Sequence, residues 1–97
     1  MKINRLGQNV TEVVFNAHDT TMHVLFSYDT PVAVFFPDSP SVVGGAIRTT
    51  KKHSVTTTKH INSWIKSKNP KRIVSQPQEY FDKYIEHKDE LNHAPRA

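Results

Sequence analysis

The first half of the chain alternates apolar and polar residues with a period of two, the pattern of β-strands that turn one face toward a core. The clearest run is 21–28, in which Met22, Val24 and Phe26 share one side. Residues 32–36 are apolar throughout, which is typical of a strand in the middle of a sheet. The pattern predicts four strands, over residues 10–16, 21–28, 32–36 and 47–49.

The second half of the chain has helical periodicity. Ile61, Trp64 and Ile65 lie at i, i+3 and i+4 and so form one apolar stripe. This stripe predicts a helix over residues 57–68 that packs on the sheet with Trp64 in the core. Pro70 disfavours helical geometry in the residue before it, so we expect the helix to end there.

A second helix is predicted to open near Pro77, because proline suits the first turn of a helix. Ser75 is its candidate N-cap, with Gln78 completing a capping box. For the first helix the candidate N-cap is Thr56 or Thr57. The expected buried side of the second helix consists of Tyr80, Phe81, Tyr84, Ile85 and Leu91.

These elements predict an α+β fold, a small antiparallel meander of three or four strands followed by two helices packed on one face. The length of 97 residues suits one modest core, so we expect a single domain over residues 1–92 and a disordered tail over 93–97. The chain has no cysteine, no signal-peptide pattern and no apolar run long enough to span a bilayer. We therefore expect a cytoplasmic protein with no membrane partner.

Charge is segregated along the chain. No Asp or Glu occurs between Asp38 and Glu79, whereas this interval holds eight of the 13 Lys and Arg residues. The net charge of +4 is thus +8 in the interval minus 2 in each flank. Such segregation builds a local positive potential, and the sequence pI of about 9.5 passes the rough screen for nucleic-acid-binding proteins.

The predicted helix over 57–68 turns Lys59, Asn62, Ser63 and Lys66 away from its apolar stripe. A surface helix more often mixes charges of both signs, because Glu–Lys pairs stabilise it. Basic side chains, hydroxyls and the free N–H groups of a helix N-terminus are the usual ligands of phosphate. The predicted binding residues are Arg48, Lys51, Lys52, Thr57, Lys59, Asn62 and Lys66. The alternatives are a merely solvated basic surface or a protein partner.

Catalytic and metal-binding motifs are lacking. The six histidines form neither HxxxH nor HExxH, and neither a phosphate-binding glycine loop nor a nucleophile elbow occurs. We therefore expect no catalytic residues, no metal, no cofactor and no enzymatic activity. Trp64 and the three tyrosines are at positions typical of structural residues, which gives no aromatic platform for base stacking.

Two segments carry a resemblance to a known family. Residues 25–33 read LFSYDTPVA and residues 49–64 read TTKKHSVTTTKHINSW. They resemble the pattern LFSY-x-TPVA followed by T-x-K-x-x-S-x-TT-x-KHIN-x-W/F, found in a family of small uncharacterised proteins frequent in bacteriophages and other mobile elements. The segments KINRLGQNVTEV and PQEYFDKYI are similar too. The chain departs from the pattern in a longer connection over 37–45 and in His53, where a larger aromatic is usual.

The resemblance implies a phage-type accessory protein that acts inside a bacterial host. Combined with the charge pattern, it predicts non-catalytic binding to the phosphate backbone of nucleic acid. The alternative is a protein-binding effector that inhibits a host defence or regulatory complex.

Overall fold

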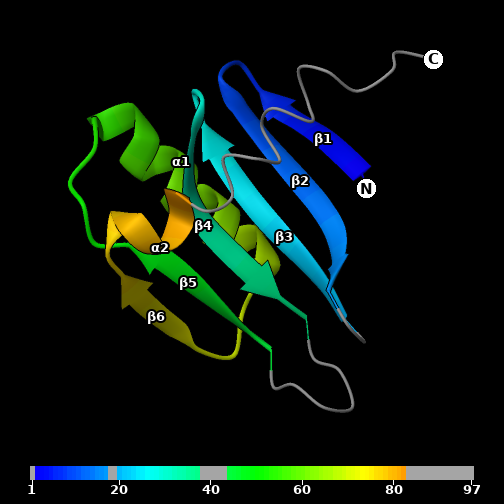
Figure 1. Ribbon diagram of the computed structural model, residues 1–97. Helices are drawn as coiled ribbons and strands as arrows, with labels where there is room; N and C mark the ends of the chain where they lie inside the picture. Colours follow the sequence, from blue (N-terminus) through cyan, green and yellow to red (C-terminus); the bar gives the residue numbers. More distant parts are fainter. Residues whose placement is uncertain (1, 18–19, 38–43, 83–97) are drawn as a thin grey trace.

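A mixed sheet carries one helix on each of its two faces (Figure 1). The computed structural model describes residues 2–17, 20–37 and 44–82. Its strands are β1 (Lys2–Gly7), β2 (Val10–Ala17), β3 (Thr20–Ser27), β4 (Thr30–Phe36), β5 (Gly45–Thr49) and β6 (Ile73–Gln76). Its helices are α1 (Val55–Lys68) and α2 (Gln78–Asp82).

The six strands lie side by side in the order of the chain. Strands β1 to β5 form an antiparallel meander, with Val13 opposite Val24 and Leu25 opposite Ala33. Strand β6 then pairs parallel to β5, with Ile47 opposite Val74. A parallel neighbour requires a long crossover connection, and α1 supplies it. The helix is therefore fixed to the sheet at both of its ends.

Both faces of the central strands are buried, and each face has its own helix. On one face Ile61, Trp64 and Ile65 of α1 pack on a cluster that includes Leu25 and Ala33. On the other face Phe81 of α2 packs against Val13, Val24, Phe26 and Val34. Successive residues of a strand point to opposite faces, so neighbours such as Val24 and Leu25 enter different cores.

The predicted architecture was wrong, although the coarse class α+β holds. The sheet has six strands of mixed direction instead of three or four in a simple meander, and the helices cover opposite faces. Two strands were not predicted. β1 is an edge strand with mostly exposed side chains, and β6 is a four-residue edge strand, also mostly exposed. Neither therefore has the apolar alternation by which a half-buried strand is found in a sequence.

The four strands that were predicted are present as β2 to β5, and β4 lies inside the sheet as expected. The predicted burial of Trp64 is also confirmed, with 4% of the residue exposed. Helix α1 ends at Lys68 as predicted, followed by Asn69 in a left-handed conformation (φ 49°) and by Pro70. Its N-cap is Ser54, whose Oγ accepts a hydrogen bond from the Thr57 backbone N–H, so the predicted caps Thr56 and Thr57 were wrong.

The predicted start of the second helix is close, since α2 begins at Gln78 directly after Pro77. Ser75 lies in β6 and is not its cap. The Gln78 side chain instead joins α2 to the sheet. Its Oε1 accepts a hydrogen bond from Thr49 Oγ1 at 2.9 Å, and its Nε2 donates to the Pro31 carbonyl at 2.8 Å. Of the expected buried side, Phe81 is buried and Tyr80 is half-buried. Tyr84, Ile85 and Leu91, and the boundary between domain and tail at residue 92, lie outside the described residues.

Candidate functional site

The outer side of α1 is basic and exposed. Lys59, Asn62, Ser63 and Lys66 all face solvent, as the position of the apolar stripe predicted. Arg48 reaches this surface from β5, because its Nη1 donates a hydrogen bond to Asn62 Oδ1 at 2.9 Å. Two further exposed lysines lie in the connection from β5 to α1. We call the resulting surface the basic face, made of Arg48, Lys51, Lys52, Lys59, Asn62 and Lys66.

Thr57 is the one predicted binding residue that does not belong to the basic face. Only 5% of it is exposed. Its Oγ1 accepts hydrogen bonds from Ser27 Oγ at 2.9 Å and from Ser54 Oγ at 3.2 Å. Thr57 therefore fastens the first turn of α1 to β3 and is not available to a phosphate.

No carboxylate of the described residues neutralises the basic face. Their acidic residues are Glu12, Asp29, Glu79 and Asp82. Glu12 is buried, Asp29 lies between β3 and β4, and the other two belong to α2 on the opposite side of the sheet (Figure 1). Glu12 pairs with Lys68, and its Oε1 also lies 3.2 Å from His23 Nδ1. Within this part of the chain no residue of the basic face therefore takes part in an ion pair.

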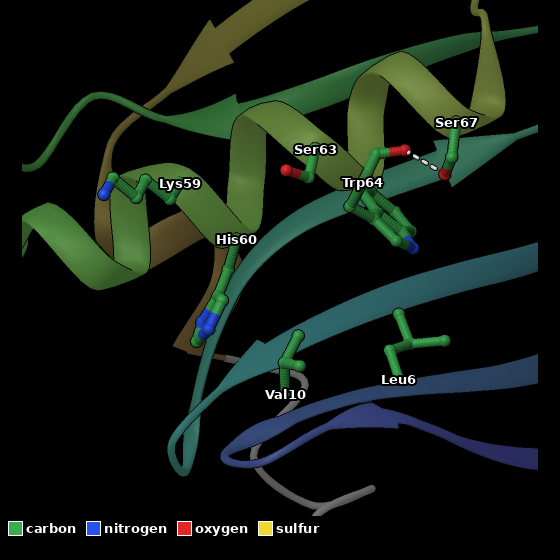
Figure 2. Close-up of a pocket in the computed structure, with 7 residues that line it drawn as sticks. All are labelled: Leu6, Val10, Lys59, His60, Ser63, Trp64 and Ser67. Carbon is green, nitrogen blue, oxygen red and sulfur yellow. Dashed lines mark hydrogen bonds between the residues drawn. The ribbon is translucent and has the colours of Figure 1, made fainter.

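A groove of about 380 Å³ runs beside the basic face, between α1 and the edge of the sheet (Figure 2). Figure 2 shows His60 and Trp64 pointing from the helix toward Leu6 and Val10 across this space. Its walls differ, since the sheet contributes apolar side chains and the helix contributes mostly polar ones. The lining residues are Leu6, Val10, Lys59, His60, Ser63, Trp64 and Ser67. Lys59 belongs to both the groove and the basic face.

His60 is held in place by a buried hydroxyl. Its Nδ1 lies 2.9 Å from Ser27 Oγ, which donates its single proton to Thr57. This contact uses Nδ1 and leaves Nε2 of the ring for a hydrogen bond to another group. Ser27 is 2% exposed, so this contact orients His60 and does not present a serine nucleophile to a substrate.

Tyr28 adjoins the groove at the His60 end, where the two ring centroids are 6.3 Å apart. Half of Tyr28 is exposed. Its φ of 58° is unusual for a bulky residue, since this region favours glycine and asparagine. The Tyr28 backbone N–H donates to the Asn9 carbonyl at 2.6 Å, which joins the β3–β4 turn to the β1–β2 turn. An aromatic ring is thus held at the surface against local backbone preference.

The buried carboxylate of Glu12 contacts Trp64, which lines the groove. Glu12, 4% exposed, accepts hydrogen bonds from Trp64 Nε1 at 3.1 Å and from Asn4 Nδ2 at 2.9 Å, and pairs with Lys68. Burial by itself raises the pKa of the Glu12 carboxyl. The hydrogen bonds from Lys68, Asn4 and Trp64 and the charge of Lys68 outweigh burial and lower the pKa to about 2. Glu12 is therefore ionised at neutral pH. Its carboxylate oxygens are engaged by Trp64 and Lys68 of α1 and by Asn4 of β1.

His23 completes this network. Its Nδ1 lies 3.2 Å from Glu12 Oε1 and 3.4 Å from Lys68 Nζ. Burial and the positive charge of Lys68 lower the pKa of His23, and the hydrogen bond and charge of Glu12 offset them only in part. His23 is therefore neutral at pH 7.

Within the described residues no group of three or more His, Asp or Glu side chains is placed to hold a metal ion. The same part of the chain contains no helix that is long and apolar enough to cross a membrane.

Fold and site define a small mixed-sheet protein with a basic helix face beside a shallow groove. The chain belongs to a family of unknown function, DUF8033, whose model matches residues 1–83 and so covers every described strand and helix. This confirms the expected membership of an uncharacterised family. Neither the curated proteins nor the solved structures gave a significant match.

Sequence reasoning missed the groove and the network below it. Leu6 lies in β1, which was not predicted, and Tyr28 has no sequence signal that would place it at the surface. Glu12 stands in a strand as an ordinary polar residue, and its partners Trp64 and Lys68 lie more than half the chain away. The apolar stripe of α1, in contrast, was sufficient to place Lys59 and Lys66 correctly.

Proposed function

We propose that this protein is a non-catalytic accessory protein of a bacteriophage or other mobile element, which binds the phosphate backbone of nucleic acid in the host cytoplasm. The observation that carries the proposal is the basic face, an exposed cationic surface whose residues make no ion pair within the described part of the chain. The family resemblance supports the phage-type origin.

The spacing of the cations suits an extended polyanion. Lys59 and Lys66 are seven residues apart on α1, which separates them by about 10 Å along the helix axis. Both are exposed and make no ion pair within the described residues. Charges spread over such a distance match a chain of phosphates better than a single small anion.

Arg48 and Asn62 add polar donors beside the lysines. One N–H of the Arg48 guanidinium is used by Asn62 Oδ1. The guanidinium has five N–H donors, so four remain for phosphate oxygens. The contact with Asn62 also fixes the orientation of the guanidinium, which lowers the entropy lost when a phosphate binds. Backbone contacts of this kind position nucleic acid without reading its sequence.

The proposal is tested by reversing one charge on the basic face and one elsewhere. Lys66→Glu should weaken binding to a mixed-sequence duplex by roughly tenfold at low salt, measured by fluorescence anisotropy. Arg5→Glu is the matched control, because Arg5 is exposed on edge strand β1 and the change in net charge is the same. Equal losses in both variants would mean that net charge alone attracts nucleic acid, and the proposal would be wrong.

A second candidate function rests on the other edge of the sheet. Ile73 and Val74 of edge strand β6 are both exposed, although they are apolar. An exposed apolar edge strand is a ready surface for another chain. It favours the protein-binding effector that inhibits a host defence or regulatory complex. In this case a host protein captured by the wild type from nuclease-treated lysate would be lost by Val74→Lys and retained by Lys66→Glu.

A further inference from the structure

We propose that the groove and Tyr28 together bind one unpaired nucleobase of a single strand whose phosphates lie on the basic face. This inference rests on the proposed function and specifies its ligand. It assigns a base-binding role to residues outside the basic face, namely Tyr28, His60 and Ser63.

Tyr28 supplies a surface on which a base can stack. Its ring is half exposed and lies beside the His60 ring, with centroids 6.3 Å apart. Backbone strain at a bulky residue costs stability and persists only where the surroundings enforce it. Here Tyr28 is the first residue of the two-residue turn between β3 and β4, where tight hairpins favour positive φ, and its N–H donates to the Asn9 carbonyl. Aromatic side chains at the surface are the usual stacking partners of unpaired bases.

The groove beside Tyr28 suits the remaining chemistry of a base. A base is flat, with apolar faces and polar edges, and the groove has an apolar wall of Leu6 and Val10 opposite a polar helix wall. On that helix wall Nε2 of His60 and the hydroxyl of Ser63 are both available to hydrogen-bond with the edge of a base. The volume of about 380 Å³ lies at the lower end of the range for small-molecule sites.

Lys59 selects a nucleic acid over an uncharged occupant. Its side chain lines the groove and also belongs to the basic face. A base in the groove therefore places the adjoining phosphate beside Lys59 and the following ones along α1 toward Lys66. The buried carboxylate of Glu12 is already paired with Lys68, so it does not repel the strand.

The single tryptophan of the chain reports on this site, because Trp64 lines the groove. The experiment titrates the full chain with a short oligothymidylate strand, with an abasic strand of equal length and with a duplex. It records anisotropy for binding and Trp64 fluorescence for occupation of the groove. We expect saturable quenching by oligothymidylate alone, and binding of the abasic strand that is weaker by roughly tenfold.

Two pairs of variants distinguish a loss of binding in the groove from a loss of the folded structure. Ser63→Phe fills the groove, and Thr58→Phe places the same ring on an exposed position of α1 that does not line it. Tyr28→Asn removes the aromatic ring. Asparagine also tolerates a positive φ with less strain, so the melting temperature of this variant should equal or exceed that of the wild type. Tyr28→Phe keeps the ring. We expect Ser63→Phe and Tyr28→Asn to lose the preference for intact over abasic strands, and the two controls to keep it.

The possible outcomes distinguish failure of the nucleobase site from failure of the proposed phosphate-binding function. Strands that bind without quenching Trp64, or with equal affinity whether or not they carry bases, would overturn the nucleobase site and leave the basic face as the phosphate-binding surface. No binding of any strand or duplex at low salt would overturn the proposed function, and the nucleobase site with it. Retention of a captured host protein by the wild type and its loss in Ser63→Phe would assign the groove to a protein segment instead.

Discussion

The indole Nε1 of Trp64 donates a hydrogen bond over 3.1 Å to Oε1 of Glu12, a residue 52 positions earlier in the chain. The contact joins α1 to β2 through a buried carboxylate that also pairs with Lys68. Trp64 is thus both the largest apolar residue of its core cluster and a polar anchor. Because α1 carries the basic face and one wall of the groove, this contact fixes the position of the proposed binding surface.

Substitutions of Trp64 should separate its polar role from its apolar one. Trp64→Phe keeps an aromatic ring but removes the donor to Glu12, and we expect it to lower the free energy of unfolding by about 1–3 kcal/mol. Trp64→Ala also leaves a cavity and should cost about 3–5 kcal/mol. Urea denaturation followed by circular dichroism measures both. A Trp64→Phe protein as stable as the wild type would show that the hydrogen bond contributes nothing.

Glu12→Gln tests the carboxylate itself. The amide has no charge to offset Lys68, and its N–H groups cannot accept the hydrogen bonds that the carboxylate oxygens accept. We expect a loss of about 2–4 kcal/mol, since removing one partner of a buried pair leaves the other uncompensated. Glu79→Gln on α2 is the control, because Glu79 is exposed and its loss should change stability by less than about 0.5 kcal/mol. Equal effects of the two changes would contradict the structural role of Glu12.

The network should also make folding sensitive to acid. The pKa of Glu12 is about 2 in the folded protein against 4.5 as the ordinary value, so the folded state binds the proton more weakly. This stabilisation is complete above pH 4.5 and is lost as the pH falls toward 2. We expect it to amount to about 2 kcal/mol, somewhat below the full value of the shift because Lys68 is partly exposed to solvent.

His23 adds to the acid sensitivity at a higher pH. Its pKa is lowered in the folded protein, so the unfolded chain binds a proton first as the pH falls through 6.5. Stability should therefore begin to fall below this pH.

Urea denaturation of the wild type and of Glu12→Gln across the acidic range measures the contribution of Glu12. If the two proteins lost stability in parallel below pH 4.5, Glu12 would not be the group that titrates.

The start of α1 offers a prediction that distinguishes the structure from the sequence pattern. Ser54 Oγ caps the helix, so Ser54→Ala should cost about 1 kcal/mol. Thr56, a plausible cap from sequence alone, is exposed within the first turn, and Thr56→Ala should be neutral or slightly stabilising because alanine favours helix. The reverse ranking in thermal denaturation would place the helix start at Thr56.

The difference between what could and could not be predicted is one of distance along the chain. The stripe of Ile61, Trp64 and Ile65 is local, so it was sufficient to locate α1, its buried side and its exposed lysines. Residues 21–28 alternate between apolar and polar side chains, but alternation alone does not say which helix covers which face of the sheet. The partners of Glu12 lie in α1, so its burial depends on a fold that had first to be known.

Edges and turns limit prediction for a different reason. β1 and β6 pair on one side only and leave most side chains in solvent, so backbone hydrogen bonds hold them without an apolar pattern. Tyr28 is half exposed in a turn, at a positive φ that its residue type disfavours. Neither feature has a signal in residue order, although β1 contributes Leu6 to the groove and Tyr28 adjoins it.

The central claim is that the basic face binds phosphates, and the dependence of affinity on salt tests it most directly. We expect wild-type affinity for duplex DNA to fall on a straight line of log affinity against log salt concentration, with a slope of about −0.9 for each phosphate neutralised. In the double variant Lys59→Glu/Lys66→Glu the slope should become shallower by about 2, while circular dichroism shows the same fold. A wild type that does not bind at low salt, or a double variant with an unchanged slope, would contradict the claim.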